Sequence, residues 1–261
     1  MNIFLYTILF IMGLLCGSFA ALAAYRIPLK ISLTKKAFCE HCRKPLKFRD
    51  QIPLLSYIYS GGRCRYCKKK INRKTFWIEL FVGFAFILMG LFYDFEIRTL
   101  SQMQILEMIL GGMYITVLTI VILIDLEYHK ITDESIIFGI IAGILNIGFK
   151  YIYDKEFYLN KFLVYLIVLV ILLLINTLFT KKRNRHQNFF NTIFLVIIIS
   201  LFTTEIATIL TIIVTILTIV FKNIFSKIFN KRVDYDLPIA AYLGISSYIV
   251  MIIIYLIGII R

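Results

Sequence analysis

Two short cysteine motifs decide the fold of a polar segment near the amino terminus: Cys39-Glu40-His41-Cys42 and Cys64-Arg65-Tyr66-Cys67. Each motif lets two thiols of one tight turn face the same ion, and two such pairs separated by a loop are typical of a tetrahedral zinc site. The alternative is a pair of disulfides, which requires an oxidising compartment. Four thiolates complete the zinc tetrahedron, so His41 is expected to remain in solvent.

The segment that carries these motifs is strongly basic. Between Arg26 and Lys74 lie 15 of the 29 Lys and Arg residues of the chain, against only Glu40 and Asp50. Loops rich in Lys and Arg stay on the cytoplasmic side of a membrane, where thiols are kept reduced. The charge therefore favours zinc over disulfides. It predicts a small cytoplasmic zinc-ribbon-like insert over residues 26–75, with structural Zn²⁺ bound by Cys39, Cys42, Cys64 and Cys67.

Composition places the rest of the chain in a lipid bilayer. The chain has 261 residues, of which 60% are hydrophobic, and its mean hydropathy is +0.86. Soluble domains average about 45–50% apolar residues. The net charge of +14 raises the possibility of a nucleic-acid partner. The basic residues are not interleaved with aromatic ones as on a nucleic-acid surface, so the expected partner is the bilayer and not nucleic acid.

The apolar segments predict an all-α polytopic membrane protein with about eight transmembrane helices, since a crossing takes about 20 residues. The expected spans are 3–25, 76–93, 105–124, 135–153, 158–179, two short spans within 189–221, and 239–260. The two short spans are divided at Thr203-Thr204-Glu205, and without that division seven spans remain. The predicted domains are a first helix (1–25), the insert (26–75) and a helical membrane domain (76–261).

The charge of the connecting loops predicts the orientation of these helices. Basic loops alternate with acidic or mixed ones, and the basic set includes the insert, His129-Lys130, 181–185 and 222–232. Alternation of this kind puts the insert and the other basic loops in the cytoplasm, with both termini outside.

Asp125 is the first candidate for chemistry. It is expected at the cytoplasmic end of an apolar helix, where an ionisable group is either functional or simply at the interface. Aspartyl peptide hydrolysis needs a second carboxylate close enough to share a proton. The candidates are Asp236 and then Asp234, just before the last span, although both acids also suit the start of a helix that follows at Pro238.

Several motifs resemble those of the type IV prepilin peptidases, which are membrane aspartyl proteases. Gly17-Ser18-Phe19 and Tyr25-Arg26-Ile27-Pro28 are similar to the opening motif of the family, with Ala21 where Asn is usual. Segments 52–57 and 62–67 resemble its zinc segment, and Arg73 with Ile78-Glu79-Leu80 resembles the start of its second helix. Asp125 followed by Ile131-Thr132-Asp133 matches the first catalytic aspartate, with Thr132 where Pro is usual.

The resemblance implies cleavage of a prepilin-like membrane protein after a glycine, at the junction of a basic leader and an apolar helix. Many members then methylate the new amino terminus with S-adenosylmethionine. A member would be a multi-pass protein of the inner (cytoplasmic) membrane, with its zinc lobe and active site on the cytoplasmic side. On this basis Asp125 is expected to be the first catalytic acid.

The second half of the chain departs from the family pattern. The family carries its second acid in a Gly-x-Gly-Asp motif, but the corresponding loop, 180–188, has neither glycine nor aspartate. The segment 237–244 is similar to the final-helix motif. If the same region is aligned instead with the second catalytic motif, Asp236 is the second acid, followed by Ala241 and Gly244 at the family spacing. A non-catalytic binding or assembly component is therefore the alternative. A zinc-regulated transporter is weaker, because no internal repeat is evident.

Overall fold

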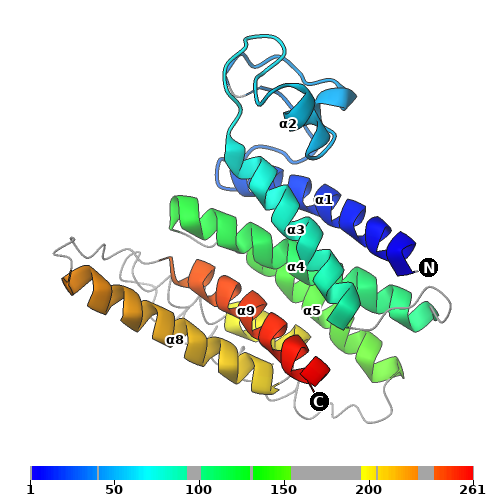
Figure 1. The fold of residues 1–261 in the computed structure, drawn as a ribbon, viewed down its shortest axis with the longest axis vertical. Coiled ribbons are helices and arrows are strands. Elements are labelled where there is room, and N and C mark those ends of the chain that lie inside the picture. Colours follow the sequence, from blue (N-terminus) through cyan, green and yellow to red (C-terminus); the bar gives the residue numbers. More distant parts are fainter. Residues whose placement is uncertain are drawn as a thin grey trace. The chain divides into compact units, whose positions relative to one another are not determined.

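The structure is a computed structural model that describes residues 2–39, 41–92, 101–129, 132–153, 195–203, 205–228 and 238–260. Within these ranges the chain is helical, with no strands beyond two isolated β-bridges. The named elements are α1 (Asn2–Arg26), η1 (Phe48–Asp50), α2 (Leu55–Tyr59), α3 (Arg73–Phe92), α4 (Gln102–Tyr128), α5 (Asp133–Tyr153), α8 (Glu205–Ile228) and α9 (Ile239–Ile260). Figure 1 draws these elements. The chain divides into two compact units, Met1–Ile120 and Val121–Arg261, with the boundary inside α4.

Helices of membrane-spanning length confirm the predicted class of protein. Among the described residues, four helices are long and apolar enough to cross a bilayer: Ile3–Arg26, Arg73–Phe92, Gln102–Tyr128 and Ile239–Gly258. A shorter apolar helix covers Ile206–Lys222. The number of eight crossings stays a prediction, and the span expected at 158–179 lies outside the described residues.

Helix ends differ by a few residues from the predicted spans. α4 runs from Gln102 to Tyr128, longer than the expected 105–124, so Asp125 lies in its last turn. At the break expected at Thr203-Thr204-Glu205, a helix over residues 195–202 ends before Thr203 and α8 starts at Glu205, while Thr204 lies outside the described residues. Polar residues that can bond the local backbone interrupt helices readily, and the Thr203 hydroxyl donates to the carbonyl of Ile199 at 2.8 Å.

In the first unit, α1 and α3 lie side by side and pack through glycines (Figure 1). A Cβ added at Gly13 would lie 2.8 Å from both the Cα of Gly83 and the carbonyl oxygen of Val82. One added at Gly17 would lie 2.9 Å from the Cα of Glu79. Gly13 and Gly17 are four residues apart, and this small-xxx-small spacing lets two membrane helices approach to backbone contact.

This close approach predicts that Gly13→Val destabilises the protein. The neighbouring atoms belong to the backbone of α3 and cannot move aside, so we expect a loss of about 1–3 kcal/mol, as for overpacked cores. Thermal unfolding in detergent would measure the change. Gly148→Ala is the control because no described residue lies within 4 Å of its added Cβ. Equal melting temperatures for the two variants would contradict the packing described here.

In the second unit, α8 and α9 pack against each other, and both helices bury hydroxylated residues. α8 buries Thr208, Thr211 and Thr215, while its Ile209, Ile216 and Phe221 are exposed. The buried hydroxyls of Thr211 and Thr215 donate to the carbonyls four residues earlier at 2.7 Å. α9 buries Ser246 and Ser247. An apolar outer face and a hydroxylated inner face are the arrangement expected of helices that meet inside a bilayer.

Candidate metal centre and carboxylate site

The four cysteines of the two motifs form one cluster. The sulfur atoms of Cys39, Cys42, Cys64 and Cys67 all lie within 4.8 Å of one another. The sulfurs of Cys39 and Cys67 are 3.9 Å apart. A disulfide would need about 2.05 Å, whereas a tetrahedral zinc ion with Zn–S bonds near 2.3 Å sets its sulfurs roughly 3.8 Å apart. The cluster could therefore hold a metal ion, while His41 is exposed and not part of it.

The two cysteine pairs have matching backbone turns. In the first, the amide of Arg43 donates to the carbonyl of Cys39 at 2.8 Å and the amide of Cys39 donates to that of Lys44 at 3.0 Å. In the second, the amide of Lys68 donates to the carbonyl of Cys64, and the amide of Cys64 donates to the carbonyl of Lys69, both at 2.9 Å. Arg43 and Lys68 have φ of 57° and 60°. The positive φ closes each turn and keeps its two sulfurs on the same side.

Backbone amides favour the thiolate at one of these cysteines. The amide of Cys67 donates to the Cys64 sulfur, outweighing the effect of burial, and with the amide of Tyr66 it lowers the pKa of Cys64 to about 7. The amide of Lys69 acts in the same direction on Cys67, but burial and the neighbouring thiols raise the pKa of Cys67 to about 11. Metal binding at neutral pH therefore has to displace protons, as is usual for thiolate sites.

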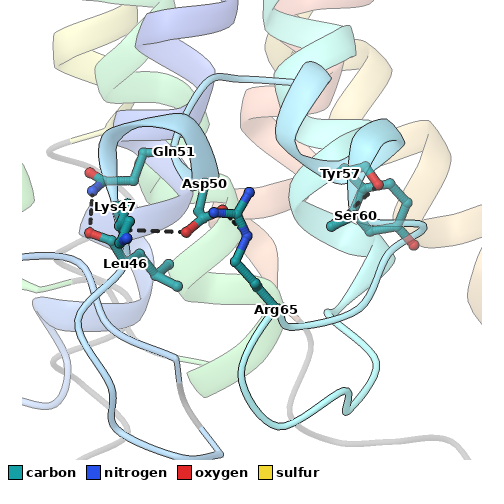
Figure 2. A network of polar contacts seen from close by, with 7 residues as sticks. All are labelled: Leu46, Lys47, Asp50, Gln51, Tyr57, Ser60 and Arg65. Atoms are coloured by element: carbon teal, nitrogen blue, oxygen red, sulfur yellow. Dashed lines mark hydrogen bonds and ion pairs between the residues drawn. The ribbon is translucent and has the colours of Figure 1, made fainter.

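A small polar network braces the second motif against the loop before α2 (Figure 2). The Asp50 carboxylate accepts from the amide of Lys47 at 3.3 Å and pairs with Arg65 at 3.5 Å. The Gln51 side chain donates to the carbonyl of Leu46 at 3.0 Å. Arg65 lies between Cys64 and Cys67, so Asp50 links the turn 46–51 directly to the cysteine cluster.

Arg26, the last residue of α1, organises the chain that leads to the first cysteine. Its side chain is only 3% exposed. Its guanidinium donates to the carbonyls of Ser32, Leu33, Lys35 and Lys36, at 2.6 to 3.2 Å. It also lies 5.7 Å from the ring centre of Phe38, beside Cys39. The arginine was expected only as part of a motif, and its planar set of donors explains why that residue type fits here.

Glu79 on α3 also holds the lobe by a bond to its backbone, as Arg26 does from α1. The sequence alone gave Glu79 no role. It is 6% exposed, and its carboxylate accepts from the amide of Leu54 at 2.8 Å, with the Ser18 hydroxyl of α1 as a second donor. Leu54 has φ of 57°, which residues with a Cβ rarely adopt. The signal in the sequence that could have identified Glu79 is an ionisable residue inside an apolar helix. Glu79 thus fastens the lobe (residues 27–72) to α1 and α3.

This contact predicts that Glu79→Ala loosens the lobe, whereas Glu79→Gln largely preserves it. Alanine leaves the Leu54 amide without its acceptor, at a cost of about 1–3 kcal/mol, while the carboxamide oxygen of glutamine still accepts. Hydrogen exchange at Leu54 should accelerate in the alanine variant only. Glu127→Ala is the control, because Glu127 is exposed on α4. Unchanged exchange at Leu54 in Glu79→Ala would rule out the contact.

Asp125 lies in the last turn of α4, buried to 5% exposure, and meets the beginning of α9. Its Oδ2 accepts from the backbone amide of Ala241 at 2.9 Å. The first four amides of a helix have no partner within it, so they bind a carboxylate readily. Pro238 marked this helix start in the sequence, but the sequence did not show that Asp125 would be the acceptor.

The proposed second acids lie outside the described residues. Asp234 and Asp236 belong to 229–237, between α8 and Pro238, so the structure does not test whether either reaches Asp125. The loop 180–188 lies outside them as well.

Fold and site together define a polytopic helical membrane protein whose four-cysteine lobe could hold a metal ion. Residues 11–93 match the family described as Bacterial Peptidase A24 N-terminal domain. Curated proteins named prepilin leader peptidase/N-methyltransferase match the chain as well. By these matches the first half of the chain is similar to the type IV prepilin peptidases.

The relatives carry consistent names. A prepilin leader peptidase/N-methyltransferase of Bacillus subtilis is 31% identical over 133 residues, which cover 51% of this chain and 50% of that protein. One of Vibrio cholerae is 33% identical over 121 residues, 42% of this chain and 45% of that protein. The Escherichia coli type 4 prepilin-like proteins leader peptide-processing enzyme is 35% identical over 98 residues, 30% of this chain and 36% of that protein. The chain thus spans half or less of the length of these relatives. No solved structure matches it.

Proposed function

We propose that the chain is a prepilin leader peptidase of the aspartic type. Its substrate would be a prepilin-like membrane protein, cut after a glycine between a basic leader and an apolar helix. The observation that carries this proposal is the position of Asp125, buried at the end of an apolar helix and bonded to Ala241. The relatives are named as prepilin leader peptidases, and these names support the same activity.

Asp236 is our proposed partner for Asp125. One carboxylate would stay ionised to activate water, and the other would stay protonated to donate to the scissile carbonyl. Ala241 follows Asp236 by five residues, and a chain of five residues spans at most about 18 Å. The bond between Asp125 and the Ala241 amide therefore supports the pairing. Asp234 is the second candidate.

We propose Zn²⁺ as the ion of the four-cysteine site, with a structural role. Four thiolates leave no open position for a reacting group, which is typical of structural zinc. The ion would hold the two cysteine turns together, so that Arg26 and Glu79 can seat the lobe on α1 and α3. The excess of Lys and Arg in the lobe supports a cytoplasmic position, on the side from which a basic leader is presented.

Methylation of the cleaved amino terminus is a second proposed activity, with S-adenosylmethionine as the methyl donor. It is supported by the names of the relatives, which pair peptidase with N-methyltransferase. No residue of the chain is assigned to the donor.

A non-catalytic membrane component is the competing proposal. It is favoured by the loop 180–188, which lacks the Gly-x-Gly-Asp sequence. Purified protein incubated in lipid with a prepilin from the same genome separates the two. A peptidase shortens the prepilin by its leader and leaves a prepilin with the cleavage-site glycine replaced uncut, whereas a binding component retains both uncut.

A further inference from the structure

The outer face of α2 is apolar and uncovered. Leu55, Ile58 and Tyr59 are 47%, 62% and 86% exposed, and Phe48 of the neighbouring η1 is 81% exposed. These four residues form what we call the α2 patch. Exposed large apolar side chains gathered on two neighbouring elements of an otherwise basic lobe indicate a contact surface.

The inner face of α2 is held against the start of α3. The ring of Tyr57 lies 5.3 Å from that of Phe76. The amide of Leu54, the residue before α2, donates to Glu79 at 2.8 Å. These two contacts fix α2 beside α3, since one is aromatic packing and the other is a hydrogen bond to a buried carboxylate.

The same contacts set the depth of α2 relative to the apolar span. Glu79 lies six residues into the helix that begins at Arg73, which is about 9 Å along its axis. Side chains on a helix lean toward its amino terminus, so Leu54 lies near the level of Phe76, one turn into α3. Trp77, at that level, is 62% exposed. Tryptophan and tyrosine are enriched where a membrane meets water.

Positive charge lies at the start of α3 and beside Phe48 of the α2 patch. Arg73 and Lys74 are exposed in the first turn of α3, and Lys47 and Arg49 flank Phe48. Basic residues near a membrane surface gain about 1 kcal/mol each from anionic lipid. The covering surface has to be apolar at its centre and negative at its edge, and a bilayer with anionic headgroups has both properties.

We propose that α2 is an interfacial helix whose α2 patch contacts anionic lipid beside α3. The bilayer is favoured over a protein partner because α1 and α3, which flank the lobe, are themselves of membrane-spanning length. The lipid surface is therefore adjacent in every copy of the protein. This contact is independent of peptidase activity.

Tryptophan fluorescence tests the contact, because the chain has one tryptophan, Trp77. In a Trp77→Phe background, Tyr59→Trp is reconstituted into nanodiscs with one copy each, made with phosphatidylglycerol and lipids brominated near the headgroup. We expect strong quenching by bromine and severalfold weaker quenching by aqueous iodide than for a Tyr66→Trp control, which lies among Arg65 and Lys68 in the second cysteine turn. Ile58→Trp is a second probe, and metal content checks the folding of each variant.

Changing the lipid composition tests whether the contact depends on anionic lipid. Replacing phosphatidylglycerol by zwitterionic lipid, or introducing Arg73→Gln with Lys74→Gln, should reduce the bromine quenching of the Tyr59→Trp probe. If that probe is as accessible to iodide as the control in both lipids, α2 is not interfacial. If it becomes protected only when two copies share a nanodisc, a second copy covers the patch. Both results overturn the proposal.

Discussion

Protein purified with Cys64→Ser is expected to lose its bound metal and the folded state of its lobe. Cys64 is 3% exposed and its sulfur faces the other three, so a serine hydroxyl there removes a ligand that no neighbour replaces. Structural Zn²⁺ contributes about 10–16 kcal/mol in zinc-finger peptides, and this binding energy is folding energy. Metal analysis should fall from about one zinc per chain to near zero, by the four-ligand count.

Tryptic cleavage should reveal the opened lobe, since residues 27–72 are rich in lysine and arginine. Removal of the metal from wild-type protein by a chelator should expose the same sites. Cys16→Ser is the matched control, because Cys16 lies in α1 and outside the cluster. Full zinc content in Cys64→Ser would refute the assignment, as would disulfides among the four cysteines in the wild type.

Asp125→Asn and Asp236→Asn are each expected to abolish prepilin cleavage. Loss of one acid removes general acid–base catalysis, which is worth about 10²–10⁴-fold in rate, and an asparagine cannot share the proton of the pair. In Asp125→Asn the carboxamide oxygen can still accept from the Ala241 amide, so the fold should survive. Cleavage of a purified prepilin in lipid is the measurement, with melting temperature reported for each variant.

Glu134→Gln serves as the matched control in that assay, because Glu134 is exposed in the first turn of α5. Full activity in Asp236→Asn would reject its pairing with Asp125 and make Asp234→Asn the next variant. Full activity in Asp125→Asn would remove the aspartic mechanism altogether. A well-folded wild type that cuts no prepilin would favour the non-catalytic component.

Much of the fold was accessible from sequence because it follows from local patterns. Apolar length predicted α1, α3, α4 and α9, and the spacing of the cysteines predicted the cluster. The ends were less accurate: α4 continues past Ile124 to Tyr128. His129 follows α4 with φ of 50°, the left-handed conformation that commonly ends a helix, and its amide donates to the carbonyl of Asp125 at 3.0 Å.

The contacts that hold the lobe on α1 and α3 could not be predicted from the sequence. The partner of Asp125 could not be predicted either. Arg26, Glu79 and Asp125 each bind backbone groups, whose positions depend on the tertiary fold and carry no residue signature. Sequence reasoning sought a side chain as the partner of Asp125 and found only Asp234 and Asp236. It had no means of identifying the Ala241 amide, because almost any residue there would offer the same N–H.

The bond between Asp125 and Ala241 also has a consequence for biosynthesis. The two residues are 116 positions apart in the chain. At about 5–20 residues per second, a ribosome needs roughly 6–23 s to reach the second after making the first. During that interval Asp125 has been synthesised but the amide of Ala241 that receives it has not. A nascent chain cut short before α9 never gains this partner for Asp125.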